Sequence, residues 1–142
     1  MSEVVVVSDP SQGRWVQRVE AGAHSFVADE RKPTGDDLGP DPYTLLLASL
    51  GTCTAMTLQM YASHKQWPLE SVTVRLRYER THVQDCESDD EPRRLHRIDR
   101  ALELGGSLTD EQRERLVQVA ERCPVHRTLT EEKEIRTTLT RT

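Results

Sequence analysis

The first 28 residues carry short apolar runs separated by turn-forming residues. A β-branched run covers residues 3–8, an Asp-Pro-Ser-Gln-Gly turn follows it, and residues 14–20 alternate weakly between apolar and polar. A further turn leads into an apolar run over residues 24–28. Short strands bounded by such turns are typical of an antiparallel meander. We therefore expect three antiparallel strands, followed by a loop over residues 31–41, which are rich in Pro, Gly and Asp.

A long helix is predicted from Pro42 to about Lys65. Asp41 suits the N-cap and Pro42 the first helical position. The first half of the segment is apolar nearly all round, as in a helix buried on every side. Cys53 is therefore expected to lie deep, and Gly51 to let another backbone approach it closely. Because one small sheet cannot cover such a helix, we expect a second subunit and an obligate dimer.

The second half of the chain alternates, turns helical, and alternates again. Clean alternation over residues 71–84 predicts a half-buried strand, and a second strand follows with Ile98, Leu102 and Leu104 facing inwards. Thr109 and Gln112 form a capping box that opens a helix. The remaining predicted elements are the second strand over residues 95–104, the helix to about residue 122, a short helical turn through residue 130, and a terminal strand over residues 134–140. The fold class is α+β, an antiparallel sheet with helices on one side, in a single domain over residues 1–142.

Composition and charge exclude several classes of protein. The chain has 142 residues, of which 35% are apolar and 30% charged, with a net charge of −5 spread over mixed-sign segments. Nucleic-acid binding needs a clustered basic face, so no nucleic-acid partner is expected. No run is expected to reach transmembrane length, and the N-terminus lacks the pattern of a signal peptide. We expect a cytoplasmic protein with no membrane partner.

The three cysteines do not form a disulfide scaffold, because the cytosol keeps structural thiols reduced. The chain has no Cys-x-x-Cys motif and its five histidines are scattered, so neither a metal site nor a bound cofactor is expected. Cys86 lies in the acidic segment 85–93, where negative charge opposes thiolate formation. It is expected to be the least reactive of the three.

Cys53 and Cys123 each lie where a helix would hold a thiol with little freedom. Cys53 is in the middle of the long apolar helix, and Cys123 ends the next helical segment. Free cysteine is among the most buried residue types, so core packing is the simpler interpretation of both. Two thiols fixed on two helices can also form a reversible disulfide if the fold brings them together. The pattern alone leaves both interpretations open.

The segments around these cysteines resemble the OsmC/Ohr family of bacterial thiol-dependent peroxidases. The resemblance rests on GPDPYTLLLASLGTCTAMT over residues 39–57 and RCPVHRTL over residues 122–129, and it covers most of the chain from about Arg14. It implies antiparallel sheets wrapped around long central helices in an intertwined homodimer. It also implies reduction of organic hydroperoxides at sites on the dimer interface. A thiol reductant, a dihydrolipoyl group in the best-known branch, would regenerate the dithiol.

Carried over by position, the resemblance makes Cys53 the peroxidatic cysteine and Cys123 the resolving one. The family places an arginine in the loop between the first two strands to activate the thiol, and Arg14 matches it better than Arg18 does. The family's glutamate, ten residues before the first cysteine, is replaced by Tyr43. A phenol cannot form an ion pair with arginine at neutral pH. Glu30 is a candidate substitute, while His126 is expected to be a helix-terminal or hydrogen-bonded histidine and not a base.

Three functions follow from these residues. The first is a hydroperoxide reductase that uses the Cys53/Cys123 pair. The second, favoured by Tyr43, is an OsmC-like binding or stress-response protein with little peroxidase activity. The third is a redox sensor that would signal through a protein partner.

Overall fold

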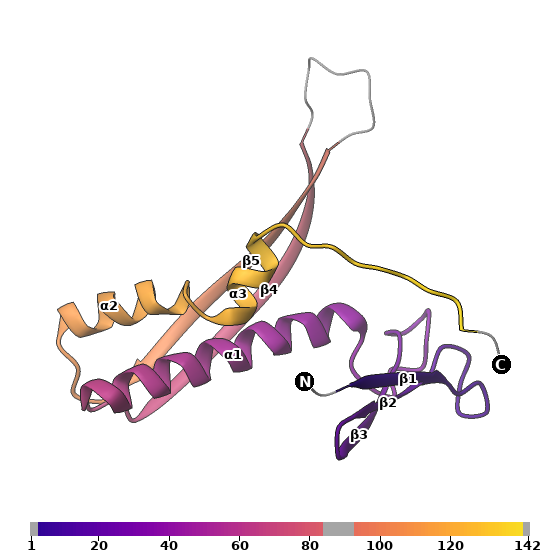
Figure 1. The fold of residues 1–142 in the computed structure, drawn as a ribbon, viewed down its shortest axis with the longest axis horizontal. Coiled ribbons are helices and arrows are strands. Elements are labelled where there is room, and N and C mark those ends of the chain that lie inside the picture. Colours follow the sequence, from indigo (N-terminus) through magenta and orange to yellow (C-terminus); the bar gives the residue numbers. More distant parts are fainter. Residues whose placement is uncertain (1–2, 84–92, 141–142) are drawn as a thin grey trace. The chain divides into compact units, whose positions relative to one another are not determined.

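The computed structural model describes residues 3–83 and 93–140 (Figure 1). The chain divides into two compact units, Met1–Ala48 and Ser49–Thr142. Helix α1 (Pro42–Lys65) begins in the first unit and continues in the second. The predicted α+β class, with antiparallel sheets and a long helix, is confirmed.

The first unit contains the predicted three-stranded meander. Its strands are β1 (Val4–Ser8), β2 (Gln17–Ala21) and β3 (His24–Ala28), which pair antiparallel in the order β1-β2-β3. Gly22 turns β2 into β3 with a φ of +63°, in the left-handed region that glycine tolerates best. Val19, in the central strand, pairs with residues of both neighbours and is buried.

A buried aspartate organises the loop that follows β3. The Asp29 carboxylate accepts hydrogen bonds from the backbone N–H groups of Glu30, at 2.7 Å, and of Asp36 and Leu38, both at 3.2 Å. Buried polar groups need such partners, and here three donors come from one loop. The loop therefore has a defined path to the start of α1, even though it contains no regular secondary structure.

Both ends of α1 lie where the sequence predicts them. The Asp41 carboxylate accepts a hydrogen bond from the Thr44 N–H at 3.1 Å and so caps the first turn. At the other end Gln66 has a φ of +58°, which takes the chain out of the helix, and Pro68 follows. Gly51 lies against β4, since a Cβ at this position would come within 2.8 Å of Leu76 Cδ1. The close neighbour of Gly51 is thus a side chain and not the backbone that we expected.

Within one chain, α1 buries a single stripe of side chains at helical spacing. This stripe consists of Leu50, Thr54, Leu58 and Ala62. Elsewhere on the helix the side chains of Met56 and Met60 are 56% and 70% exposed. The expected burial on every side therefore does not arise within one chain.

The apolar character of α1 also reaches membrane length. Its most apolar 18-residue window has a mean hydropathy of 1.3, enough to cross a membrane by length and composition alone. The expectation that no run reaches this length is wrong on that criterion. Core helices of soluble proteins meet the same criterion, so it does not by itself indicate a membrane protein.

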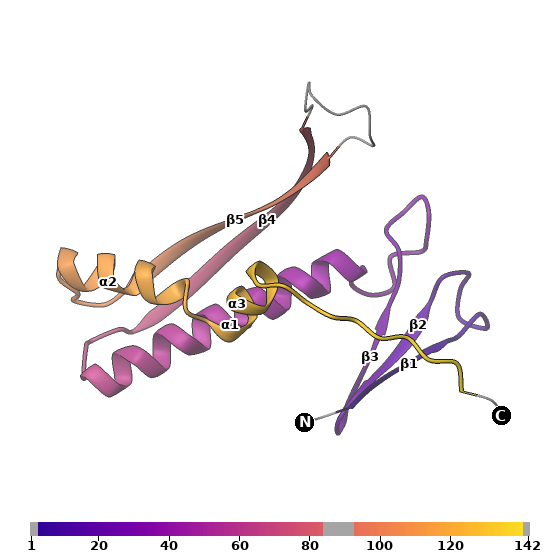
Figure 2. The same ribbon diagram turned by 45° about the horizontal axis from the view of Figure 1, so that its top comes forward.

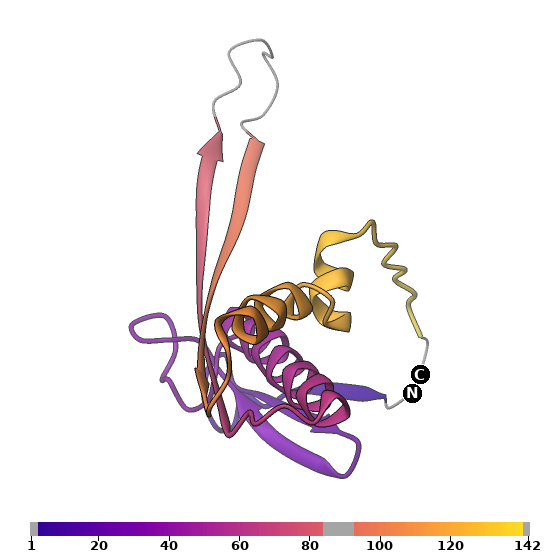
Figure 3. The same cartoon turned by 90° about the vertical axis from the view of Figure 1, so that its left-hand side faces the viewer.

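The second unit packs helices against a long β-hairpin. Strands β4 (Ser71–Val83) and β5 (Arg93–Gly105) pair antiparallel, and helices α2 (Asp110–Ala120) and α3 (Pro124–Thr130) follow. Helices α1 and α2 lie side by side next to the hairpin (Figure 3). The core between them contains Leu58 of α1 and Leu116, Val119 and Ala120 of α2. The predicted capping box of Thr109 and Gln112 is present at the start of α2.

The predicted strand over residues 134–140 is not formed. Residues 132–140 have neither helix nor strand structure, and the side chains of Ile135 and Leu139 are 88% and 91% exposed. A strand needs a neighbour to satisfy its backbone groups. The two sheets of the described chain, which comprise β1 to β5, do not supply one. Alternation of apolar and polar residues therefore does not suffice to predict a strand over residues 134–140.

Candidate functional site

Cys123 lies at the junction between α2 and α3 and is completely buried. Pro124 occupies the first turn of α3, and Cys123 is its N-cap. The Cys123 Sγ accepts a hydrogen bond from the backbone N–H of His126 at 3.2 Å. The Cys-Pro-Val-His sequence thus holds the thiol in one orientation, because the cap fixes both the backbone and the side chain of the cysteine.

Thr54 joins Cys123 to the turn of α1 that carries Cys53. Its hydroxyl donates a hydrogen bond to the Leu50 carbonyl oxygen at 2.7 Å, and Thr54 Oγ1 lies 3.8 Å from Cys123 Sγ. Thr54 is fully buried, and it is the residue that follows Cys53. In Figure 2, α3 lies beside the middle of α1, where this contact occurs. The fold therefore brings the two cysteine motifs to the same place.

Arg100, on β5, completes the group around Cys123. Its Nη1 donates to Thr54 Oγ1 at 3.0 Å and its Nη2 donates to His126 Nδ1 at 3.1 Å. A guanidinium has no acceptor atom, so Nδ1 must accept and the imidazole proton is on Nε2. His126 is thus a hydrogen-bonded histidine, as expected, because its Nδ1 lone pair already accepts from Arg100.

The sequence interpretation missed Arg100, although a signal for it was present. Ile98 and Leu102 are predicted on the inward face of their strand. Arg100 lies between them, two residues from each, and so belongs to the same face. In the ladder Arg100 pairs with Leu76, the residue that lies against Gly51 of α1. An arginine on the inward face of a strand is unusual, because charged residues are rarely buried without a partner. That position was the available indication of a site residue.

The burial of the two thiols differs from the expectation at Cys53 alone. Cys53, expected to lie deep, is half-buried, whereas Cys123 is 0% exposed. Both are free thiols. Only an accessible thiol can meet a solvent-borne oxidant, so within one chain Cys53 is the better placed to react first. Cys86 lies outside the described residues.

Arg14 and Arg18 both lie in the first unit, and both are exposed. The Arg14 guanidinium lies 5.0 Å from the centre of the Trp15 ring, which is a cation–π distance. Arg18 forms a surface ion pair with Glu20, with 3.5 Å between Nε and Oε1. Of the two arginines, Arg18 therefore already has a carboxylate partner. The assignment of Arg14 as the activating residue stays a prediction.

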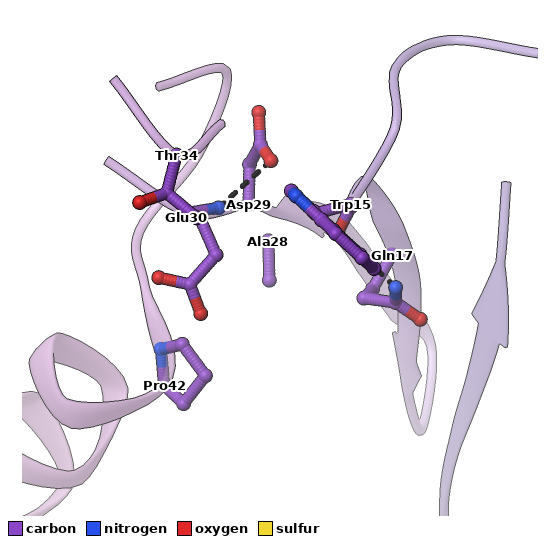
Figure 4. Close-up of a pocket in the computed structure, with 7 residues that line it drawn as sticks. All are labelled: Trp15, Gln17, Ala28, Asp29, Glu30, Thr34 and Pro42. Atoms are coloured by element: carbon purple, nitrogen blue, oxygen red, sulfur yellow. Dashed lines mark hydrogen bonds between the residues drawn. The ribbon is translucent and has the colours of Figure 1, made fainter. Parts of the chain in front are cut away.

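A pocket of about 390 Å³ lies beside Trp15 in the first unit (Figure 4). Its lining residues are Trp15, Gln17, Ala28, Asp29, Glu30, Thr34 and Pro42. Trp15 and Glu30 lie on opposite sides of this pocket. Glu30, the candidate substitute for the family's glutamate, is thus a pocket residue. Tyr43, which replaces that glutamate, is 47% exposed in the first turn of α1.

Comparison with known proteins identifies the fold and the family. Residues 35–138 match the family model described as OsmC-like protein. An OsmC-like protein from Mycoplasma pneumoniae is similar in structure, with a TM-score of 0.70 and 18% identity over 91% of this chain and 86% of that one. An organic hydroperoxide resistance protein OsmC from Legionella pneumophila has a TM-score of 0.67 and 16% identity, over 92% and 89% of the two chains.

A third similar structure has a ligand in one of its active sites. It is a putative organic hydroperoxide resistance protein from Vibrio cholerae with captopril bound, with a TM-score of 0.64 and 17% identity over 92% of this chain and 84% of that one. No curated protein matches the chain.

Proposed function

Because the chain belongs to the OsmC-like protein family, we propose that it is a thiol-dependent peroxidase that reduces organic hydroperoxides through Cys53 and Cys123. The observation that carries the proposal is the contact between Thr54 and Cys123, at 3.8 Å. It brings the buried thiol to the helix turn that carries the half-buried one. Core packing of two unrelated cysteines would not require this arrangement.

The proposed reaction has three steps. The Cys53 thiolate attacks the outer oxygen of the hydroperoxide, the O–O bond breaks, and the alcohol leaves while Cys53 becomes a sulfenic acid. The Cys123 thiol then displaces the sulfenic hydroxyl, which forms the Cys53–Cys123 disulfide and releases water. An external dithiol, of which dihydrolipoyl is the expected kind, reduces the disulfide and is itself oxidised. Arg14 is the proposed cation that stabilises the Cys53 thiolate.

The proposal includes a homodimer in the cytoplasm. Met56 and Met60 are exposed on an apolar helix, and contiguous exposed apolar surface of this kind marks an interaction site. A second copy would cover this surface. Replacement of Met60 by Glu should therefore convert a dimer into monomers in size-exclusion chromatography with light scattering. A Met60→Leu control should remain dimeric, and a monomeric unsubstituted protein would refute the dimer.

The function is tested by peroxide consumption in the presence of a dithiol. The purified protein should consume cumene hydroperoxide when dihydrolipoamide is supplied, and Cys53→Ser should abolish turnover. Cys86→Ser is the matched control, because Cys86 has no role in the proposal. Turnover that persists in Cys53→Ser would show that Cys53 is not the peroxidatic residue.

One observation favours a second function. Tyr43 takes the place of a carboxylate that pairs with the activating arginine in the family. An OsmC-like binding or stress-response protein with little peroxidase activity would tolerate this change. Free thiols should then stay unchanged after one equivalent of cumene hydroperoxide, whereas a peroxidase would lose two thiols per chain and recover them with dithiothreitol.

A further inference from the structure

We propose that Arg100 is a positioning residue that holds Cys123 ready to form the disulfide, through Thr54 and His126. This inference rests on the proposed function, and it assigns a role to a residue outside the Cys53, Cys123 and Arg14 set. It concerns the second step alone, in which Cys123 attacks the sulfur of Cys53.

The first support is the position of both hydrogen-bond acceptors. Arg100 donates to Thr54 Oγ1 at 3.0 Å and to His126 Nδ1 at 3.1 Å. Each acceptor belongs to a residue that also contacts the thiol: Thr54 Oγ1 lies 3.8 Å from Cys123 Sγ, and the His126 N–H donates to the same sulfur at 3.2 Å. The guanidinium thus ties together the two sides of the Cys123 environment, one on α1 and the other on α3.

The second support is the charge balance of the site. Arg100 is half-buried on the inward face of β5, yet no carboxylate of the described residues lies within ion-pair distance of it. By contrast Arg97, on the same strand, is exposed and pairs with Glu79 at 2.6 Å. A partly desolvated cation is costly unless its hydrogen bonds are satisfied. Here neutral acceptors beside a thiol satisfy two of them.

The third support is the burial of the thiol. Cys123 is 0% exposed, so it cannot reach a partner by free rotation in solvent. Its attack on Cys53 requires the sulfur to start in a defined orientation, because a reacting atom misplaced by about 1 Å can cost about a hundredfold in rate. Arg100 braces the α1 and α3 residues that define this orientation.

The attack can be observed without any hydroperoxide. In a Cys86→Ser background, Cys53 attacks 5,5′-dithiobis(2-nitrobenzoate), which forms a mixed disulfide and releases one thionitrobenzoate. Cys123 then attacks the Cys53 sulfur, which forms the Cys53–Cys123 disulfide and releases the second thionitrobenzoate. The two releases separate the reactivity of Cys53 from that of Cys123. This makes the test independent of peroxidase activity.

We expect Arg100→Met to slow the second release about tenfold to a hundredfold while the first release stays within about twofold. Arg100→Lys should also be slowed, since a single ammonium cannot span the two acceptors as the planar guanidinium does. Arg97→Met, on the exposed face of the same strand, is the matched control and should behave like the unsubstituted protein. Where Arg100→Met does not fold, Arg100→Lys carries the test.

The inference would be overturned if both releases keep their rates in Arg100→Met, or if both slow equally together with a lower melting temperature. The first result would mean that Arg100 has no role, and the second that its role is structural. A protein that shows both releases but consumes no cumene hydroperoxide would refute the proposed function and leave this inference standing. Absence of a second release from the unsubstituted protein would overturn the inference.

Discussion

Arg100 and Thr54 form a hydrogen bond of 3.0 Å between the inward face of β5 and the buried stripe of α1. Thr54 lies one residue after Cys53, and its Oγ1 is 3.8 Å from the sulfur of Cys123. The Thr54 hydroxyl thus contacts Arg100 of β5, the Leu50 carbonyl of its own helix and the buried thiol of Cys123. This relationship makes Thr54 the most sensitive position at which to test the site.

Replacement of Thr54 by Val should destabilise the protein. Valine has a similar shape but no hydroxyl, so Arg100 Nη1 loses its acceptor in a buried place, at a cost of about 1–3 kcal/mol in the free energy of unfolding. Urea unfolding at fixed protein concentration measures this cost. Thr52→Val, on the exposed side of the same helix, should change stability by no more than about 0.5 kcal/mol. Equal losses in both variants would contradict the role of the buried hydroxyl.

Alkylation should distinguish the two thiols by their burial. In the native protein iodoacetamide should modify the half-buried Cys53 first, because the fully buried Cys123 is reached only after local opening. Peptide mapping by mass spectrometry gives the order, and both cysteines should react at similar rates in 6 M guanidinium chloride. Earlier modification of Cys123 in native conditions would refute the proposed roles.

Arg14 and Arg18 provide a matched pair for the activating cation. Arg14→Met should lower the rate of Cys53 oxidation by hydroperoxide about tenfold or more, because the Cys53 thiolate would lose the cation proposed to stabilise it. Arg18→Met removes only a surface ion pair with Glu20, so it should leave the rate within about twofold. Stopped-flow measurement of thiol loss separates the two. The opposite result would assign the role to Arg18.

The cap of α1 should make stability depend on pH. Hydrogen bonds from the Thr44 hydroxyl and N–H, together with the charge of Arg31, lower the pKa of the Asp41 carboxyl below its ordinary value. Such a group stabilises the fold above its unfolded pKa of about 4, and this stabilisation is lost as the pH falls through the folded pKa. Asp41→Ala should therefore cost about 1 kcal/mol at pH 7. The difference from the unsubstituted protein should shrink as the pH falls from 5 towards 2.

Thermal unfolding over this pH range measures the effect. Asp99→Ala, at an exposed position of β5, is the control and should show a smaller loss at pH 7. A pH-independent difference between Asp41→Ala and the unsubstituted protein would show that the charge of the cap does not matter.

The sequence predicts an element of the fold well where a few neighbouring residues determine it. The Asp41-Pro42 start of α1 and the capping box of Thr109 depend on a few neighbouring residues, and both are present. The strand over residues 134–140 fails because pairing depends on a distant neighbour, which alternation does not reveal. The depth of Cys53 was overestimated for a related reason. The apolar character of a helix does not say which of its faces one chain covers.

The sequence predicts the two cysteines of the candidate site but not Arg100. Cys53 and Cys123 lie in recognisable sequence motifs, and their environments do meet through Thr54. Arg100 belongs to no motif. Its role depends on the pairing of β5 with β4 and on the packing of that hairpin against α1, which bring its side chain to Thr54 and His126. Such a contact between distant parts of the chain is set by tertiary structure.

In the proposed cycle, the unequal exposure of the two thiols would give the regeneration step a direction. Cys53 is half-buried and Cys123 is fully buried, so a reductant would reach the Cys53 sulfur of the proposed disulfide and not the Cys123 sulfur. The course of thiol–disulfide exchange depends on which sulfur is attacked. The transient adduct with the reductant would thus always form on α1, and Cys123 would always be the leaving group. Two equally exposed thiols would allow two mixed disulfides with the reductant, one on each cysteine. The proposed cycle would form only the mixed disulfide on Cys53.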